Sequence, residues 1–470
     1  MCAKPKGATI SPLRSDGPNI LMVMSDQHRA DWMGCAGADW VQTPNLDALA
    51  ERGAMFSNCR TNSPLCAPAR AALASTKRCS EVGSLSNGHL YPYDEPTYYQ
   101  QLRAAGYRVG CVGKTDLHKP DHWEGLNGDR PLMHHLGFTD PKETEGKMSA
   151  GRRYDRLVCP YQKYLDDHGL LADFIEDYEM RGEKPVCYAA DSVLPTHAYH
   201  DDFVGRSACE FLQNVGDENP WHYFVSFVGP HDPFDAPTEY AERYRDAPMP
   251  DPIEDTLQGK PAYHRERHEA EWAGADAECL ADCMRQYSAM VSLIDHHVGQ
   301  MVEVLEARGM LDNTVIIYCA DHGEMLGDHS FFRKAVFYES AVRVPLIIAG
   351  PGIEPIGQSE ALVELNDAAA TCLDLAETEP LPGASASSLM PILSDERDEH
   401  RQYQISELLD WRMICDGRYK YIQRPGDMEQ LYDLQEDPDE LNNLVNDAPD
   451  RVRAMRERLE AEVGKPPEME

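Results

Sequence analysis

The chain contains the stretch Asn19-Ile20-Leu21-Met22-Val23-Met24-Ser25-Asp26-Gln27, an apolar run that ends abruptly in polar side chains. A run of this length that is apolar at nearly every position is typical of a strand buried on both faces. Such strands occur in parallel sheets that are covered by helices on both sides. The stretch therefore predicts a central strand with Ser25, Asp26 and Gln27 at its carboxyl end.

Four further apolar runs follow along the chain, at residues 107–112, 223–228, 314–319 and 344–349. Helical patterns lie between them, at residues 45–52, 98–105 and 281–308. Strands that alternate with helices predict an α/β protein with a large, mostly parallel sheet sandwiched by helices.

The pattern changes after about Asp367. We predict a strand pair at residues 412–422 and 430–434 and a terminal helix at 450–463, which together form a smaller C-terminal α+β subdomain. Residues 139–195 and 246–275 are polar and without clear periodicity, so we interpret them as irregular loops that contact a ligand.

Side chains that can bind a metal or transfer a proton also follow the second, third and fourth apolar runs. Lys114 and then His118 follow residues 107–112, His231 follows 223–228, and Asp321-His322 follows 314–319. Ligands of open α/β sheets bind at the carboxyl ends of the strands. One such residue alone is often a helix cap or a structural histidine, but the set together predicts a functional site at one edge of the sheet.

The side chains expected at this edge predict a metal ion. Asp26, Gln27 and Asp321 offer oxygen ligands, which suit a hard divalent ion such as Ca²⁺ or Mg²⁺. His322 adds a nitrogen ligand and makes Mn²⁺ an alternative. In the structural alternative, Gln27 and His322 only form hydrogen bonds with their neighbours.

A cysteine lies in the segment Ser63-Pro64-Leu65-Cys66-Ala67-Pro68-Ala69-Arg70, just before a helical pattern at residues 71–75. Pro68 suits the first turn of a helix. Cys66 would then lie at a helix N-terminus, where free amides favour anions, with Arg70 one turn further on. The segment predicts a reactive cysteine, with a buried structural thiol as the alternative.

Taken in chain order, these motifs resemble the sulfatase family of the alkaline phosphatase superfamily. Cys66-Ala67-Pro68-Ala69-Arg70 matches the family's C-x-P-x-R maturation signature, in which the cysteine is oxidised to formylglycine. The resemblance spans roughly residues 18 to 445. Its other motifs are Pro18–Leu21 with Ser25–Gln27, Thr43–Asp47, Gly113-Lys114, Pro230–Phe234, Asp321–His329 with Lys334, Arg343–Leu346, Asp416–Tyr421 and Leu431–Leu434.

The sequence departs from the family pattern at several positions. Ala69 replaces the usual serine of the signature, and Leu73-Ala74-Ser75 replaces Leu-Thr-Gly. Gln27 stands where a second metal carboxylate is usual and His322 where an asparagine is common, as in the choline sulfatase and phosphonate monoester hydrolase branches. Lys114 is followed by Thr115-Asp116-Leu117-His118 rather than by the frequent Lys-x-His spacing.

The resemblance implies an alkaline phosphatase-like fold and a set of roles for these residues. It implies one divalent metal, Ca²⁺ in the first instance, and a formylglycine-generating maturation enzyme as a partner. The implied metal ligands are Asp26, Gln27, Cys66, Asp321 and His322. The implied sulfuryl-binding cations are Arg70, Lys114 and Lys334, and the implied proton donors are His231 and His118.

Two other functions remain open at this point. A phosphonate monoester or phosphodiester hydrolase would use the same residues. A relative of another class would keep Cys66 unmodified and only bind an anion or a metal. Arg333, next to Lys334, is expected to point away from the site.

The 470 residues include 80 acidic and 44 basic ones, for a formal net charge of −36. Nucleic acid and anionic membranes are therefore not expected as partners. We expect a small anionic sulfate ester as the substrate, bound by a local cluster of cations. His134, His135, His197 and His200 are further candidates for contacts with its organic part. The sequence does not indicate an oligomeric state.

No apolar run of signal-peptide or membrane-span length is present, so we predict a cytoplasmic protein. The 14 cysteines do not form a small disulfide framework, and most are expected to be reduced, buried and inert. The predicted organisation is an N-terminal extension at 1–17, a catalytic α/β domain at 18–370 and a C-terminal subdomain at 371–470.

Overall fold

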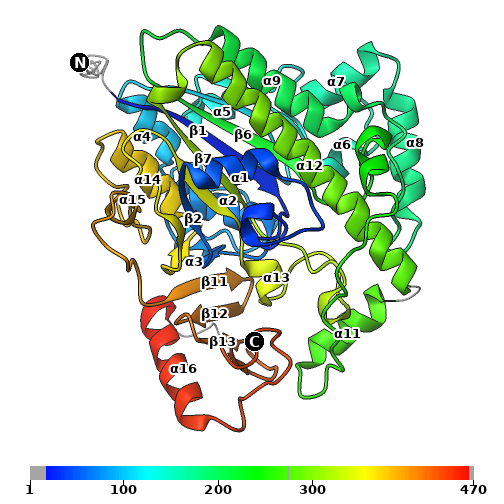
Figure 1. Cartoon of the computed structure of the whole chain (residues 1–470), viewed down its shortest axis with the longest axis vertical. Helices are drawn as coiled ribbons and strands as arrows, with labels where there is room; N and C mark the ends of the chain where they lie inside the picture. The colour runs from blue at the N-terminus through cyan, green and yellow to red at the C-terminus, as the bar shows by residue number, and fades with distance from the viewer. Residues whose placement is uncertain (1–16, 273–274, 465–470) are drawn as a thin grey trace, which may run out of the picture.

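The structure is a computed structural model that describes residues 17–272 and 275–464, so most of the predicted N-terminal extension lies outside the described residues. Its larger part is built on an eight-stranded sheet in the order β5-β4-β6-β1-β7-β8-β2-β9, with helices on both sides (Figure 1). The strands are β1 Asn19–Asp26, β2 Gly53–Phe56, β4 Arg108–Gly113, β5 Asp140–Glu143, β6 Trp221–Pro230, β7 Thr314–Ala320, β8 Leu346–Ala349 and β9 Gly357–Ser359. Outside this sheet, β3 (Cys59–Arg60) pairs with β10 (Val363–Glu364).

The sheet is mostly parallel, as predicted. β1 pairs in parallel with β6 and β7, and β4 with β5 and β6, while β8 runs antiparallel to β7 and β2. All five predicted apolar runs are strands of this sheet. Sequence patterns missed β2, β5 and β9, which have only three or four residues each and, in β5 and β9, no apolar run.

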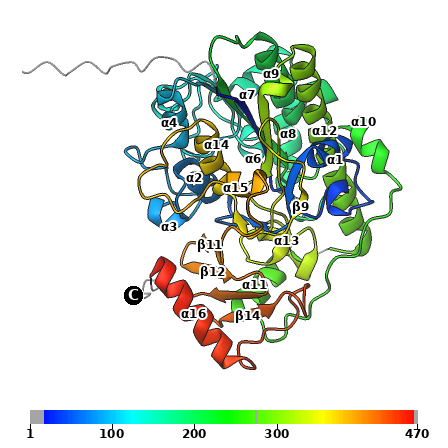
Figure 2. The ribbon, with the colours of Figure 1, turned by 60° about the vertical axis from the view of Figure 1, so that its left-hand side comes forward.

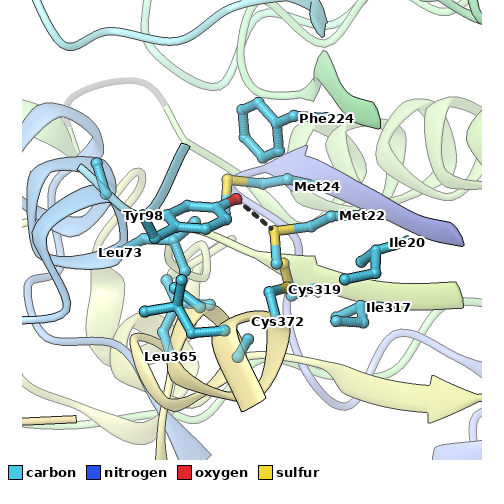
Figure 3. Close-up of a cluster of buried hydrophobic side chains, with 14 of the residues drawn as sticks. Ile20, Met22, Met24, Leu73, Tyr98, Phe224, Ile317, Cys319, Leu365 and Cys372 are labelled. Atoms are coloured by element: carbon cyan, nitrogen blue, oxygen red, sulfur yellow. Dashed lines mark hydrogen bonds between the residues drawn. The ribbon is translucent and has the colours of Figure 1, made fainter. Parts of the chain in front are cut away.

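β1 is buried along its whole length because alternate side chains enter two different helical layers. Ile20, Met22 and Met24 pack on the layer that contains α2, α4 and α14, where the Tyr98 hydroxyl donates to the Met22 sulfur at 3.5 Å (Figure 3). Leu21 and Val23 pack on the layer that contains α1, α9 and α12. These helices are α1 Pro44–Glu51, α2 Cys66–Ser75, α4 Tyr98–Ala104, α9 His200–Asn214, α12 Ala277–Ala307 and α14 Asp367–Leu375.

The two segments interpreted as irregular contain helices, so that interpretation is wrong. They hold α6 Lys147–Ala150, α7 Pro160–Asp167, α8 Leu171–Gly182 and α11 Ala262–Glu271. In α8, Phe174 and Tyr178 lie one turn apart and are both buried. Charged residues around this narrow apolar stripe obscure the helical period in the sequence. The remaining short helices are α3 Cys79–Val82, α5 Pro131–His135, α10 Thr238–Ala241, α13 Glu339–Val342 and α15 Met390–Leu393.

A separate antiparallel sheet near the C-terminus confirms the predicted smaller α+β unit. It has the order β11-β12-β13-β14 and is flanked by α16 (Figure 2). The bounds are β11 Gln404–Leu408, β12 Trp411–Cys415, β13 Tyr419–Gln423, β14 Gln430–Asp433 and α16 Pro449–Val463. The single strand predicted at 412–422 is instead a hairpin of β12 and β13. The chain turns at Gly417, which has φ +92°, while the Asp416 carboxylate accepts from two following amides.

The predicted boundary between residues 370 and 371 falls inside α14, which packs on the large sheet, whereas the small sheet begins at Gln404. The domain limits therefore stay a prediction. In the described part of the chain, no helix is both long and apolar enough to cross a membrane.

Candidate active site

Four buried side chains converge where the central strands end. β1 and β7 pair with Ser25 opposite Ala320, so Asp26 and the Asp321-His322 pair emerge side by side at one edge of the sheet. The start of α2 adds Cys66. The ligand atoms of Asp26, Cys66, Asp321 and His322 all lie within 4.8 Å of one another, and all four residues are buried.

Cys66 occupies the first turn of α2, as the sequence predicts. Leu65 before it is extended, with φ −157° and ψ 136°, and the helix begins at Cys66 itself. The Cys66 sulfur lies 3.1 Å from His322 Nε2 and 3.8 Å from Asp26 Oδ1. Burial raises the pKa of the thiol, but the charges of Lys114, Lys119 and Lys334 outweigh it and hold the pKa well below its ordinary value.

Arg70, one turn into α2, connects the two carboxylates. Its Nε donates to Asp321 at 2.8 Å, Nη1 donates to the Ser226 hydroxyl at 2.7 Å, and Nη2 lies 3.6 Å from Asp26. Nη2 has no hydrogen-bond partner among the described residues although it is buried. This leaves the two N–H groups of Nη2 to donate to a bound anion.

Lys114 follows β4 and forms ion pairs with Asp26 and, at 3.1 Å, with Asp116. Burial disfavours its charge, but these carboxylates raise the pKa of Lys114 well above its ordinary value. Burial likewise raises the pKa of Asp26, and Cys66 adds to this, yet Lys114, His231 and Arg70 bring it below the ordinary value. We refer to Asp26, Cys66, Arg70, Lys114, Asp321 and His322 as the inner cluster.

Gln27 lies next to the inner cluster in an unusual backbone conformation. Its φ is +71°, and its amide N–H donates to Asp321 Oδ1 at 3.0 Å. Its Nε2 donates to Glu324 and, at 3.4 Å, to Asp232, so Oε1 is left to accept from Lys334. A left-handed backbone at a residue other than glycine costs on the order of 1–3 kcal/mol and is common at functional sites.

A second group of side chains lies on loops at the mouth of the site. The Lys334 ammonium lies 2.6 Å from His231 Nε2, and His231 Nδ1 lies 2.6 Å from the Asp232 carbonyl oxygen. Arg333 Nε donates to Asp232 at 3.1 Å. The expectation that Arg333 points elsewhere is wrong, because Asp232 pairs with it. We refer to His231, Asp232, Arg333 and Lys334 as the outer cluster.

Two pockets meet at the outer cluster. One of about 460 Å³ is lined by Asp232, Arg333 and Tyr188, and one of about 440 Å³ by Leu65, Lys334 and Arg333. Since Leu65 immediately precedes Cys66, the second pocket reaches the residue next to the inner cluster.

The other predicted histidines have their own partners or environments. His118 is half-buried near Tyr91 and Arg130, and none of its contacts in the described part of the chain reaches the inner cluster. His134 contacts the Phe138 carbonyl and His135 the Tyr93 carbonyl. His197 is exposed, and His200 is buried and stacked on Tyr161. The structure gives none of these four substrate-contact candidates a contact with the inner cluster.

The inner cluster has the chemistry of a metal site. Two carboxylates and an imidazole face one point in a fully buried location. Oxygen ligands suit Ca²⁺ or Mg²⁺, and a nitrogen ligand is also accepted by Mn²⁺. Buried carboxylates need a positively charged partner. Arg70 and Lys114 pair with Asp26 and Asp321, and a divalent cation would provide a further partner for both carboxylates. The residues present fit a divalent metal.

Comparison with known proteins identifies the family. The family model described as Sulfatase matches residues 18–378, and one described as N-sulphoglucosamine sulphohydrolase, C-terminal, matches residues 327–465. The chain belongs to the sulfatase family. It is therefore a sulfuric ester hydrolase, and the resemblance seen in its motifs is confirmed. A divalent metal and a formylglycine are typical of sulfatases.

Named relatives cover nearly the whole chain of this sulfatase. A choline-sulfatase of Rhizobium meliloti is 32% identical over 91% of this chain and 82% of its own length. An arylsulfatase of Clostridium perfringens is 29% identical over 91% of this chain and 90% of its own. The fold is similar to that of the phosphonate monoester hydrolase of Agrobacterium radiobacter, with a TM-score of 0.77, 24% identity, and coverage of 95% and 96% of the two chains.

Motif reasoning on the sulfatase sequence missed three residues. Glu324 and Asp232 both accept from the Gln27 amide. Lys119 pairs with Asp116, and its charge helps to lower the pKa of the Cys66 thiol. Glu324 and Asp232 lie inside family motifs, where acidic residues beside Gly323 and His231 were a usable signal. Lys119 lies outside any motif, so no sequence signal indicated it.

Proposed function

We propose that this sulfatase hydrolyses sulfate esters of small saccharides or other small alcohols at the inner cluster. The observation that carries the proposal is the convergence of Cys66, Asp26, Asp321 and His322 within 4.8 Å at the first turn of α2. Arg70, Lys114 and Lys334 surround this point in a protein with a net charge of −36. Local cations are what an anionic ester needs in order to bind an acidic protein.

The metal would be held by Asp26, Asp321, His322, position 66 and the oxygen of Gln27, with Ca²⁺ favoured and Mn²⁺ or Mg²⁺ as alternatives. When bound, a divalent ion neutralises charge on the ester oxygens and favours the ionised form of a coordinated hydroxyl. The Gln27 amide nitrogen donates to Glu324 and Asp232, so the Gln27 oxygen, which accepts from Lys334, is the atom that could bind the ion.

Position 66 would supply the nucleophile after a maturation enzyme converts Cys66 to formylglycine. The hydrated aldehyde offers two hydroxyls on one carbon, of which one attacks sulfur and the other then loses its proton and expels sulfate. Arg70 Nη2, which has no partner among the described residues, and the Lys114 and Lys334 ammonium groups would bind the sulfuryl oxygens.

His231 would protonate the oxygen of the departing alcohol. Its Nδ1 contacts the Asp232 carbonyl oxygen at 2.6 Å and the Asp232 carboxylate at 3.1 Å, which keeps a proton on Nδ1 and fixes the ring. Nε2 faces Lys334, and when Lys334 turns to the sulfuryl group Nε2 would take up a proton from water and pass it to the oxygen of the alcohol. His118, which lacks contact with the cluster, is not assigned this step.

Two findings support a saccharide as the alcohol. An N-acetylglucosamine-6-O-sulfatase of Bacteroides thetaiotaomicron is 28% identical over 92% of this chain. The pockets beside Arg333 are also large enough for a sugar ring and carry charged and aromatic side chains. Choline sulfate is the alternative small ester, given the relative from Rhizobium meliloti.

The test combines mass spectrometry with a substrate panel. The peptide that contains position 66 should carry formylglycine in protein produced together with a maturation enzyme. That protein should turn over sulfated saccharides, choline sulfate or an aryl sulfate faster than a phosphonate monoester. Faster phosphonate turnover would instead support the phosphonate hydrolase alternative, and an unmodified, inactive protein would support the binding alternative.

A further inference from the structure

Three cysteines gather at a place that the proposed reaction does not use. Cys187 lies in the turn that follows α8, and Cys279 and Cys283 lie one turn apart near the start of α12. The sulfur of Cys279 is 2.8 Å from the carbonyl oxygen of Cys187, and the sulfur of Cys283 is 2.9 Å from the same oxygen. Two thiols therefore contact one backbone atom of the third cysteine.

The three thiols differ in access and in acidity. Cys279 is half-buried, whereas Cys187 and Cys283 are buried. The neighbouring side chain of Cys283, against partial burial and with help from Cys187, lowers the pKa of Cys279 to about 7. A thiol that reaches solvent and ionises near neutral pH is the one that reacts first with an external disulfide.

Helix geometry decides which partner can close a bond with Cys279. Residues four apart on a helix have Cβ atoms about 5–6 Å apart, but a disulfide needs about 3.8 Å. Cys279 and Cys283 therefore cannot be joined without unwinding the first turns of α12. Cys187 belongs to a turn, which can adjust, and its side chain is hydrogen-bonded to Cys279.

We propose that Cys279 and Cys187 form a reversible disulfide by exchange with a low-molecular-weight disulfide such as oxidised glutathione. The Cys279 thiolate attacks one sulfur of the external disulfide and releases one thiolate, which leaves a mixed disulfide on Cys279. The Cys187 thiol gives its proton to the released thiolate as it attacks the Cys279 sulfur, and the second thiolate leaves. The two protons lost by the cysteines end on the two released thiols, so the protein is oxidised by two electrons.

The crosslink would fix one wall of a pocket at the outer cluster. Lys184, Val186 and Tyr188, on either side of Cys187, line the same pocket as Asp232 and Arg333. Just beyond them, Ala189 forms a bridge with Phe234, and the Ala190 amide donates to the Phe234 carbonyl. The disulfide would tie this wall to α12, and reduction would release it.

The experiment exposes the folded, full-length protein to oxidised glutathione and maps its disulfides by peptide mass spectrometry without reduction. We expect a peptide with Cys187 joined to one with Cys279, and loss of this link on reduction. Hydrogen exchange at the amides of residues 186–190 should slow on oxidation. Cys187→Ser should instead keep glutathione on Cys279 and show no slowing.

Two further variants and a zinc measurement complete the test of the disulfide. Cys283→Ala should still form the link, but more slowly, because Cys279 loses the neighbour that lowers its pKa. Cys209→Ser, a half-buried cysteine on α9, should behave like the wild type. A persistent glutathione adduct in the wild type, three thiols that stay reduced, or a Cys279–Cys283 link would overturn the proposal. Co-purifying zinc that is lost on replacing any one of the three cysteines would also overturn it, in favour of a metal site.

Discussion

The inner and outer clusters lie next to each other but are built differently. In the inner cluster, the side chains of Asp26, Arg70 and Asp321 are 2% exposed or less, and they lie on strand ends or on a buried helix. In the outer cluster, His231 is 15% exposed and Arg333 46% exposed, and both lie on loops. The residues proposed to act on the sulfuryl group are thus largely buried in regular structure, whereas those proposed to contact the alcohol reach water.

This difference sets how strongly each cluster should respond to substitution. Removing one partner of a buried ion pair leaves the other charge unpaired and costs about 3–5 kcal/mol. Losing an exposed pair costs about 1 kcal/mol or less. Inner substitutions should therefore affect both turnover and stability, while outer substitutions should act mainly on turnover and substrate affinity.

The largest effect is expected for Asp321→Asn, which keeps the shape of the side chain but removes a carboxylate from the inner cluster. Replacing a residue that only hydrogen-bonds to a metal ligand lowers metal affinity or activity about ten- to a hundredfold. We therefore expect that replacing a ligand itself lowers turnover more than about a hundredfold. Saturating Ca²⁺ at about 100 times its Kd should stabilise the wild type by about 2.7 kcal/mol and the variant much less. Rates and thermal unfolding with and without metal measure both.

Asp312→Asn is the matched control, because Asp312 is exposed at the opposite end of β7. It should leave the rate and the metal response unchanged. Normal turnover and normal metal stabilisation in Asp321→Asn would show that the inner cluster is not the metal site.

A smaller effect is expected for Lys334→Ala, on the border between the two clusters. By analogy with the loss of one oxyanion-hole donor, turnover should fall by about a hundredfold or more. Lys163→Ala, at an exposed lysine on α7, is the control, and steady-state kinetics on an aryl sulfate compares the two. Equal, small effects would mean that Lys334 does not contact the sulfuryl group.

Arg333→Ala should have a weaker effect, through KM rather than kcat. The Arg333–Asp232 pair is partly exposed, so its loss should change kcat/KM by about fivefold or less. Arg153→Ala, which removes an exposed pair with Glu179, should change nothing. A drop in kcat as large as that of Lys334→Ala would place Arg333 in the inner chemistry and remove the contrast between the clusters.

The smallest effect is expected for His118→Ala. His118 has no contact with the inner cluster in the described part of the chain, so its replacement should alter rates by less than about twofold. The pH–rate profile is the sharper measurement, because a proton donor contributes one limb of it. We expect the limb to persist in His118→Ala and to vanish in His231→Ala, and the reverse result would exchange the two roles.

The sequence predicted what depends on local pattern. Long apolar runs such as residues 19–24 and 314–319 identify the central strands, and the position of Asp26 and Asp321 after these runs places both at one edge. Cys66 at the start of a helix followed from Pro68 and the helical run after it. These inferences depend only on how far apart residues lie along the chain, which folding does not change.

The remainder depends on tertiary contacts that spacing does not encode. The contact of Arg333 with Asp232 joins two loops that are far apart in sequence, so the residues next to Lys334 gave no sign of it. The turn at Gly417 divides an apolar run that resembles one strand. The distance of His118 from the cluster likewise depends on the path of the chain after Asp116, where φ is +56°.

The burial of Cys66 has a consequence for how the enzyme is made. Its side chain is 0% exposed, and every residue of α2 is buried. A second enzyme cannot bind a segment that is buried in this way unless the surrounding sheet unfolds. The proposed oxidation of Cys66 would therefore have to take place before the chain folds, in competition with folding. Slower folding during synthesis should raise the fraction of active molecules. A chain that folds before Cys66 is oxidised should stay inactive.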